Sequence, residues 1–476
     1  MFKRLVVLIV LLVCSPLSHP SAATEEFSMV AERATRNYQE MLDVRLIRVL
    51  VVSSKTFYFF DGAQQRGSSY DLLNLFEEQL NEKLAAGNLK VYVGFIPVSR
   101  DQLIPALLEG RGDLAVANLT ITPERQEVVD FSIPMFKNLR ELLVTSTNLK
   151  PMSSIDELSG MDVHVRRSSS YYSSLLETNT KLQERGLPPV NIVLVSEYLE
   201  DEDLLEMVNA QLMPAIVVDS HKVHFWEQIF DNIQVHEELA LRNGGNIAWA
   251  FRKNSPEFAQ VVNDFVKENR KGSLMGNILF KRYLQNTKHV RNALDSGEME
   301  KFNATAAFFQ QYADQYDFDW LMLIAQAYQE SRLDQGTRSS AGAVGVMQLL
   351  PSTAADKSVD IEGITELENN IHAGAKYMRW LRDRYFNDPD MSREEQTLFT
   401  FAAYNAGPGK VIRLRKEAAE MGLDPNIWFD NVEVVAAKRI GRETVQYVSN
   451  IYKYWVAYKL AIDINQGKQN AQGKKH

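Results

Sequence analysis

The sequence has almost no cysteine. Cys14 is the only one among 476 residues, and it lies in an N-terminal segment that we expect to be removed. A mature chain without a thiol excludes a disulfide framework and any metal site that depends on cysteine ligands. It is compatible with an oxidising compartment, which permits disulfides but does not require them.

The sequence also lacks an excess of positive charge. Its formal net charge is −9 at pH 7, so no basic surplus exists to neutralise the phosphates of a nucleic-acid partner. The same balance argues against binding of the whole protein body to an anionic membrane surface. Hydrophobic residues make up 45% and charged residues 24% of the chain, as in globular proteins, and the length predicts two or three domains.

Long apolar runs are scarce. The N-terminal run at 5–13 follows two basic residues, and small residues precede a cleavage position after Ala23. This pattern predicts an export signal, because the run is too short to span a bilayer. A cysteine after an apolar run also occurs in lipoprotein signals, but Val13 stands before Cys14, where such signals have a small residue.

Strands and helices alternate from residue 45 to residue 286, which predicts a parallel, doubly wound sheet. The first elements expected are strand 46–54, helix 69–87, strand 89–98, helix 100–112 and strand 113–121. After residue 286 the apolar residues follow a helical period. We therefore expect a signal segment at 1–23, an α/β domain at 24–286, a linker at 287–301, an all-α domain at 302–463 and a disordered polar tail at 464–476.

A carboxylate ends an apolar stripe in the helical part. Trp320, Leu323 and Ala327 follow helical spacing, and the same stripe continues to Glu330. Burial beside apolar groups raises the pKa of a carboxyl, and an acid that keeps its proton near pH 7 can protonate a leaving group. The alternative is a partly exposed glutamate at a helix end that pairs with Arg332.

Three further stretches follow Glu330-Ser331 in the sequence. They are Gly345-Val346-Met347-Gln348, Ala403-Tyr404-Asn405, and Glu443 with Tyr447-Val448. In this order, the four stretches resemble the landmarks of the soluble-type lytic transglycosylase domain, a relative of goose-type lysozyme. The resemblance covers residues 302–460 and implies a lysozyme-like fold.

The resemblance implies cleavage of the β-1,4 bond between N-acetylmuramic acid and N-acetylglucosamine in peptidoglycan, with a 1,6-anhydro product and without water or a cofactor. Glu330 is implied as the sole acid and base, since the sugar supplies the second function. Supporting roles fall on residues that hydrogen-bond the sugar (Ser331, Gln348, Asn405), orient the reacting centre (Tyr447), shape the cleft (Met347, Tyr404) or allow close backbone approach (Gly345).

Some of these positions have alternatives. Met347 and Tyr404 are also typical core residues. We expect Glu443 to be a structural partner. Asp334, one turn beyond Glu330, is a candidate second carboxylate, and with it a hydrolase of the muramidase type becomes the alternative function.

The α/β region resembles the family-3 extracellular solute-binding proteins over residues 47–285, which implies a two-lobed periplasmic-binding-protein fold. In "LTITPER" Arg125 matches the clamp for a ligand carboxylate, with Thr120 beside it, and in "AIVVDS" Asp219 matches the partner of a ligand ammonium group. Guanidinium suits a carboxylate because it offers two parallel N–H donors. Ser168 and Ser169 match the hydroxyl loop that faces the ligand.

The two resemblances together imply a periplasmic, peripherally outer-membrane enzyme that cuts glycan strands and whose first domain binds an amino acid or muropeptide and regulates cleavage. Two other functions stay open: a solute sensor with a wall-binding helical domain, and a receptor that serves a permease. His221 and His224 lack further ligands at metal-binding spacing, so we expect solvated helix residues and no metal site.

Overall fold

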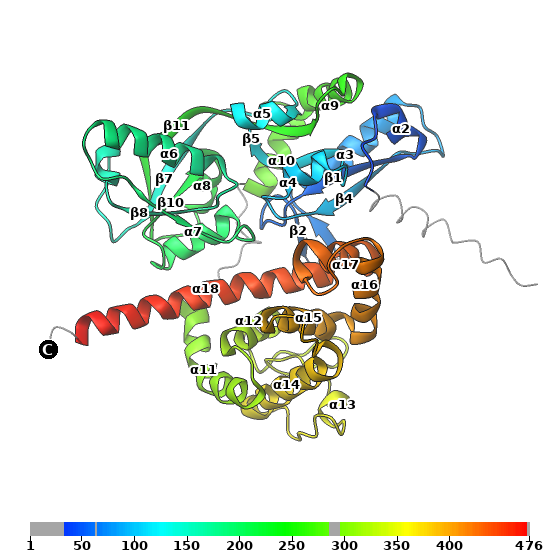
Figure 1. Ribbon diagram of the computed structural model, residues 1–476, viewed down its shortest axis with the longest axis vertical. Coiled ribbons are helices and arrows are strands. Elements are labelled where there is room, and N and C mark those ends of the chain that lie inside the picture. Colours follow the sequence, from blue (N-terminus) through cyan, green and yellow to red (C-terminus); the bar gives the residue numbers. More distant parts are fainter. Residues whose placement is uncertain (1–32, 62–63, 285–295, 474–476) are drawn as a thin grey trace, which may run out of the picture.

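The computed structural model describes residues 33–61, 64–284 and 296–473. The expected signal segment at 1–23 and residues 287–295 of the expected linker lie outside this range. Two α/β lobes form one half of the molecule and a group of helices forms the other, with the long helix α18 (Arg442–Gly473) between them (Figure 1). The predicted two-lobed domain followed by a helical domain is thus confirmed.

One sheet of nine strands runs through both lobes. Its order is β4-β1-β5-β11-β7-β10-β8-β9, with β6 paired to β11. In lobe 1 the strands are β1 (Leu46–Val51), β4 (Tyr92–Pro97), β5 (Leu114–Thr120) and β6 (Val129–Phe131). In lobe 2 they are β8 (Asp162–Val165), β9 (Asn191–Leu194) and β10 (Ala215–Asp219). A small hairpin, β2 (Phe59–Asp61) and β3 (Gln64–Arg66), lies apart from this sheet.

The sheet is mixed rather than parallel. β1 pairs in parallel with β4 and β5, and β8 with β9 and β10. Between these groups, β7 (Phe136–Ser146) and β11 (Ile233–Arg252) run antiparallel and connect the lobes. The expectation of a wholly parallel sheet was therefore wrong at the centre, because the direction of β7 and β11 is set by their pairing with distant segments, which the order of elements along the chain does not show.

Helices cover both faces of the sheet. Lobe 1 carries α2 (Tyr38–Asp43), α3 (Ser68–Lys83), α4 (Leu103–Leu108), α5 (Pro123–Val128), α9 (Pro256–Asn269) and α10 (Leu274–Leu284). Lobe 2 carries α6 (Ser170–Glu184), α7 (Asp201–Asn209) and α8 (Ser220–Trp226). Each lobe has apolar side chains buried between sheet and helices, which is the main stabilising term of such layers.

The helical domain packs around α12 (Trp320–Ser331). Nearly every side chain of α12 is buried, and the Asp319 carboxylate caps its start by accepting from the Leu321 N–H at 2.8 Å. The other helices are α11 (Ser296–Tyr316), α13 (Pro351–Ala354), α14 (Leu367–Leu381), α15 (Arg393–Ala406), α16 (Pro408–Glu420) and α17 (Glu433–Arg439). Because α12 is enclosed by this core, its last turn is held in a fixed position.

Two boundaries differ from expectation. Helix α11 begins at Ser296, inside the linker expected at 287–301, and α18 continues to Gly473, inside the tail expected to be disordered. The extension at 296–301 contains two Glu, one Met and one Lys, which favour helix even where no apolar face is present. Elongating an existing helix is also easier than starting one.

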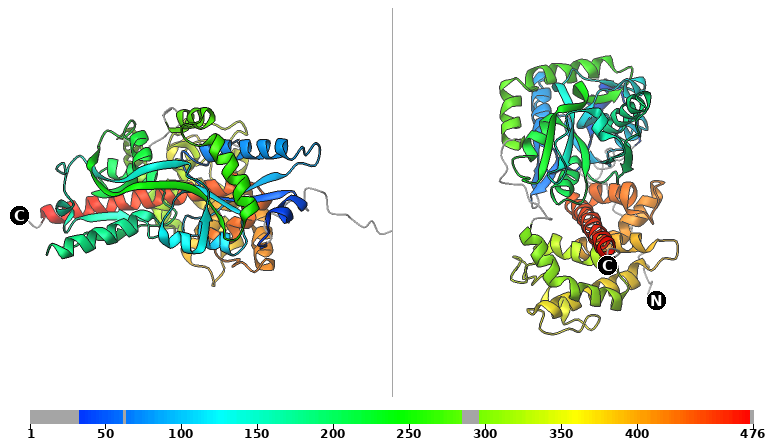
Figure 2. Two further views of the ribbon diagram at one scale, coloured as in Figure 1. Left: turned by 90° about the horizontal axis from the view of Figure 1, so that it is seen from above. Right: turned by 90° about the vertical axis from the view of Figure 1, so that its left-hand side faces the viewer.

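Helix α18 joins the two halves of the molecule, as the end-on view in Figure 2 shows. The Lys453 ammonium on α18 lies 3.1 Å from the Asp203 carboxylate on α7. Tyr198 of lobe 2 stacks on Phe429 of the helical domain with ring centroids 4.3 Å apart, and its hydroxyl donates to Asp430 at 3.1 Å. Lobe 2 is therefore in direct contact with the helical domain.

Candidate active site and ligand cleft

Glu330 lies in the last turn of α12 and is partly buried. Burial raises the pKa of its carboxyl to about 7, and a hydrogen bond from Tyr447 opposes that rise. Arg332, two residues after Glu330, adopts a left-handed conformation with φ of 56° and ends the helix. The Glu330 carboxylate contacts the Tyr447 phenol, whereas the alternative considered from the sequence was a pairing with Arg332.

Tyr447 on α18 reaches across to Glu330. Its hydroxyl donates to Glu330 Oε1 at 2.5 Å and accepts from the Gln326 side-chain Nε2 at 3.3 Å. Because an amide nitrogen can only donate, Gln326 directs the phenol proton toward Glu330. Burial and the nearby carboxylate raise the pKa of Tyr447 well above its ordinary value, so the phenol keeps its proton. Because Oε1 of Glu330 accepts that phenol proton, Oε2 is the oxygen that carries the proton of the Glu330 carboxyl.

The loop after α12 is held by two side-chain amides. Asn370 on α14 is fully buried; its Oδ1 accepts from the Met347 N–H at 2.8 Å and its Nδ2 donates to the Val344 carbonyl at 2.8 Å. Gln335 Oε1 accepts from the Val346 N–H at 3.1 Å. This loop is therefore fixed on α14 by bonds that only folding brings together.

Gly345 is required at its position in this loop. Its φ is +79°, and a Cβ there would lie 2.6 Å from Asn370 Cγ. Ser331 fastens the same loop to α12, since its hydroxyl donates to the Val346 carbonyl at 2.9 Å. The Ser331 hydroxyl thus contacts the protein backbone, whereas the sequence predicted a contact with sugar.

The remaining predicted residues divide between wall and surface. Met347 is completely buried, and the Tyr404 hydroxyl donates to its carbonyl at 2.7 Å, so both shape the site from behind. Gln348 Nε2 donates to the Gly345 carbonyl at 2.8 Å. Asn405 is exposed, and its Oδ1 accepts from the Thr444 hydroxyl at 2.7 Å.

The two other carboxylates considered from the sequence lie outside this arrangement. Asp334 is exposed and its Oδ1 accepts from the Gly336 N–H at 2.8 Å. Glu443 is exposed on the first turn of α18. In the described part of the chain, His, Cys, Asp and Glu side chains form no group of three that suits a metal ion.

The cleft between the lobes holds the predicted clamp. Arg125 donates to the Thr120 carbonyl of lobe 1 and the Ser168 carbonyl of lobe 2, both at 2.8 Å. Burial lowers the pKa of its guanidinium to about 10. The Ser168 hydroxyl donates to Glu197 at 2.5 Å and that of Ser169 to the Arg166 carbonyl at 3.0 Å. These two hydroxyls therefore serve lobe 2 itself rather than facing the cleft as free donors.

Asp219 lies buried at the start of α8. Burial raises the pKa of its carboxyl to about 7, and Asn118 Nδ2 donates to it at 3.4 Å. His221 was predicted to be solvated, but it is buried, with Nε2 3.0 Å from Asn118 Oδ1. The error arose because the apolar neighbours of His221 come from lobe 1, far away in the sequence.

The lobes are closed on one another by buried ion pairs. Arg100 of lobe 1 contacts Glu200 of lobe 2 at 2.5 Å, and Lys55 of lobe 1 contacts Glu206 on α7 at 2.5 Å. Asp203 on the same helix contacts both Lys55, at 3.2 Å, and Lys453. The acidic start of α7 thus joins both lobes and α18.

Comparison with known proteins matches this arrangement. The family profile of the bacterial extracellular solute-binding proteins, family 3, matches residues 47–285, half of the chain. The chain belongs to this family. In addition to the family-3 solute-binding domain, it matches the transglycosylase SLT domain over residues 307–425. Tyr447 lies beyond that match, so its assignment depends on its contact with Glu330.

Relatives combine the same two domains along most of their length. The chain is 28% identical to the membrane-bound lytic murein transglycosylase F of Desulfosudis oleivorans, over 88% of this chain and 92% of that protein. It is 26% identical to the protein of the same name from Pseudomonas fluorescens strain Pf0-1, over 90% and 88%. These findings support a peptidoglycan lytic transglycosylase and do not favour a sensor or a transport receptor.

Among solved structures, the substrate-binding protein of an amino acid ABC transporter is similar to the family-3 solute-binding domain. It covers 51% of this chain and 100% of its own, at 21% identity and a TM-score of 0.41.

Proposed function

We propose that this protein cleaves the MurNAc-β-1,4-GlcNAc bond of peptidoglycan without water and leaves 1,6-anhydro-MurNAc ends. The observation that carries the proposal is the single acid at the end of α12. Glu330 has a pKa of about 7, and the other two candidate carboxylates are exposed. One group with this pKa can act as acid and then as base near neutral pH.

The proposed reaction uses one proton twice. Glu330 protonates the glycosidic oxygen as the bond from that oxygen to C1 breaks, and the departing sugar leaves with a hydroxyl. The MurNAc acetamido group stabilises the positive charge that develops at C1. The ionised Glu330 then takes the proton of the 6-hydroxyl while that oxygen bonds to C1. The carboxyl is regenerated and no water is consumed, which removes the need for a second carboxylate.

We assign the neighbouring residues to support. Tyr447 orients Glu330, while Gly345, Met347 and Tyr404 shape the site from behind it. Ser331 fixes the loop at Val346, so its effect on substrate is indirect. The half-buried amide of Gln348 and the exposed amide of Asn405 are the candidates for contact with sugar hydroxyls and acetamido groups. No cofactor enters this scheme.

The N-terminal domain is proposed to bind an amino acid or short wall peptide and to regulate cleavage. Arg125 and Asp219 lie in the cleft between the lobes, and a ligand carboxylate would displace the Thr120 and Ser168 carbonyls from Arg125. Charge-assisted pairs of this kind are stronger than bonds to neutral carbonyls. The Lys453–Asp203 pair then offers a route from the lobes to α18, which also carries Tyr447.

We place the protein in the periplasm, peripherally attached to the outer membrane. The expected export signal and the membrane-bound relatives support this location. Across residues 33–61, 64–284 and 296–473, the helices include none with the length and apolar character needed to cross a bilayer.

The product of wall digestion in ¹⁸O-labelled water tests the proposal. A lytic transglycosylase gives anhydro ends without label, whereas a muramidase gives reducing ends that carry ¹⁸O. We expect unlabelled anhydro ends from the parent and from Asp334→Asn, and no cleavage by Glu330→Gln. Labelled reducing ends would establish the hydrolase instead, and loss of activity in Asp334→Asn would show that a second carboxylate takes part.

A further inference from the structure

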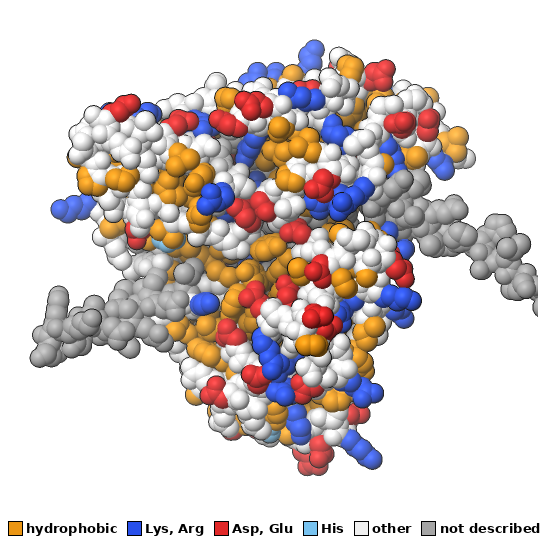
Figure 3. All heavy atoms as spheres, viewed as in Figure 1, with side chains coloured by type: hydrophobic (Ala, Val, Ile, Leu, Met, Phe, Trp, Pro, Cys, Tyr) orange, Lys and Arg blue, Asp and Glu red, His pale blue; other side chains and the backbone are white. Residues whose placement is uncertain are grey.

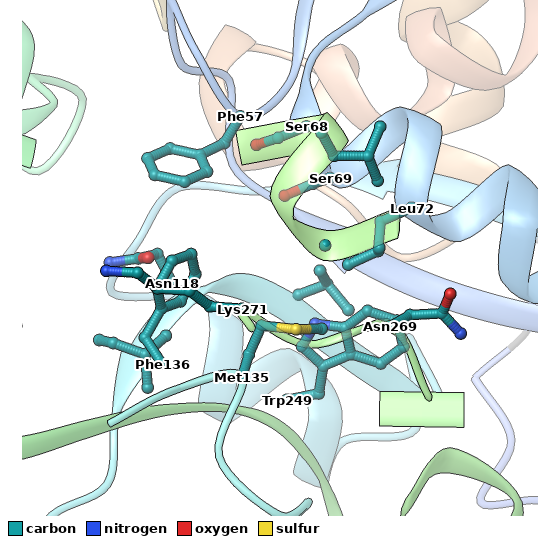
Figure 4. A pocket seen from close by; sticks show the side chains of 14 residues that line it. Phe57, Ser68, Ser69, Leu72, Asn118, Met135, Phe136, Trp249, Asn269 and Lys271 are labelled. Carbon is teal, nitrogen blue, oxygen red and sulfur yellow. The ribbon is translucent and has the colours of Figure 1, made fainter. Parts of the chain in front are cut away.

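A pocket opens into lobe 1 beside the cleft. It encloses about 60 Å³ and is lined by fourteen residues, of which eight have apolar side chains. In Figure 4, Met135 and Trp249 face Leu72 across the pocket, while Phe57 and Phe136 lie toward one end. A water needs roughly 10–15 Å³ of such space, so the pocket has room for about four to six non-hydrogen atoms.

The end of the pocket marked by the two phenylalanines meets lobe 2. The Phe136 ring stacks on His221 with centroids 4.8 Å apart, and the Lys222 ammonium lies 5.6 Å from the centre of the Phe57 ring. Both partners belong to the first turn of α8, and Ser220 alone separates them from Asp219. Closure of the lobes therefore covers this pocket with the helix that carries the candidate ammonium-binding carboxylate.

Asn118 connects the pocket to that carboxylate. It lines the pocket, and its Nδ2 donates to Asp219 at 3.4 Å. Its Oδ1 can only accept, so His221 Nε2 carries a proton and donates to it at 3.0 Å. In the neutral ring this leaves Nδ1 as an acceptor, and within the described residues buried Nδ1 has no hydrogen-bond partner. A buried acceptor without a donor is unfavourable, and a ligand ammonium group would supply donors.

The charge of the pocket limits what enters it. Of the fourteen lining residues, Lys271 is the one with a charged side chain, and it is largely exposed. A cationic ligand side chain would meet a like charge there. An ionised carboxylate would lose its water among eight apolar side chains, which is costly without a buried partner.

We infer that this pocket takes the apolar side chain of an amino-acid ligand, of leucine, isoleucine or methionine size, whose ammonium group lies against Asp219. The inference rests on the proposed ligand binding of the N-terminal domain and narrows the ligand class. Alanine would leave the pocket largely empty, and tryptophan would exceed its volume.

Calorimetric titration of the full chain with leucine, alanine, arginine and glutamate tests the inference. Three additional buried carbons should make leucine bind roughly 60-fold more tightly than alanine, and arginine and glutamate should bind no better than alanine. Equal or tighter binding of arginine or glutamate would overturn the apolar assignment and leave ligand binding intact. Absence of heat with all four at millimolar concentration would overturn both.

Two variants test the pocket itself. Val116→Phe fills the space from β5 and should reduce leucine binding to the level of alanine, with folding checked by circular dichroism. Met135→Ala enlarges the space and should shift preference from leucine toward phenylalanine. Parent-like leucine affinity in a folded Val116→Phe protein, or an unchanged preference in Met135→Ala, would refute the assignment.

Discussion

Replacing Tyr447 with phenylalanine should move the pH dependence of wall cleavage. The variant keeps the ring and removes the hydroxyl that donates to Glu330 Oε1 at 2.5 Å. That bond favours the ionised carboxylate and opposes the effect of burial, which still dominates and raises the pKa to about 7. Without it, the pKa of Glu330 must rise, because burial then acts unopposed.

The magnitude follows from the strength of such a bond. A hydrogen bond to a charged group contributes about 1.5–3 kcal/mol, and one pKa unit corresponds to about 1.4 kcal/mol. Since water partly replaces the phenol at this partly exposed site, the pKa should rise by about one unit. The active form carries the proton, so kcat/KM falls as pH rises through the pKa of the free enzyme.

The assay is the initial rate of soluble product release from purified wall between pH 5 and pH 9. In Tyr447→Phe the fall at high pH should occur about one unit later than in the parent, while the plateau drops roughly tenfold because the acid is less well oriented. Gln326→Leu is the matched control, because it removes the donor to the phenol and leaves the phenol in place. Its shift should have the same sign and be smaller. An unchanged or downward shift in Tyr447→Phe would refute the assigned contact.

Three further outcomes are expected. Glu330→Gln should have a free energy of unfolding up to ~3 kcal/mol higher than that of the parent at pH 8. The folded parent binds more protons than the unfolded chain between about pH 4.5 and 7, so its stability falls as pH rises through that window. Urea unfolding at pH 4 should therefore show no difference between the two proteins. Gly345→Ala should lower the free energy of unfolding by roughly 2–4 kcal/mol and remove most activity, because its Cβ clashes with Asn370. At Gly342, φ is +85° and a Cβ meets nothing within 4 Å. Gly342→Ala should therefore lower the free energy of unfolding by only about 1 kcal/mol in the same assay. Lys453→Met should lower the free energy of unfolding by roughly 1–3 kcal/mol, because Asp203 loses one cationic partner and keeps the other, Lys55. An unchanged melting temperature would show that the Lys453–Asp203 pair does not join the two halves of the molecule.

The sequence alone predicted those site features that lie close together along the chain. Glu330 was predicted because its apolar neighbours belong to its own helix, where spacing shows which side chains share a face. Gly345 was predicted by its residue type, since a left-handed position favours glycine. The helical region and the α/β region could be told apart for the same reason, because the hydrophobic periods of helices and strands can be read from residues close together in the sequence.

The sequence could not predict contacts between distant segments. Gln326 and Asn370 are neutral amides inside helices, and their importance comes from Tyr447 and Met347 on other elements. The Ser168 and Ser169 hydroxyls matched a ligand loop in type, yet partners within lobe 2 occupy them. One signal was available: Gln326 lies one turn before Glu330 on an otherwise apolar face, where a polar side chain needs a buried partner.

Direct titration of the Glu330 carboxyl tests the central claim. The infrared difference spectrum between the parent and Glu330→Gln reports the band of the protonated carboxyl as pH changes. The account predicts that this band disappears with a midpoint near pH 7, the pKa to which burial raises the group. A midpoint at the ordinary glutamate value, about 4.3, would show that the acid is ionised at neutral pH and cannot deliver the proton.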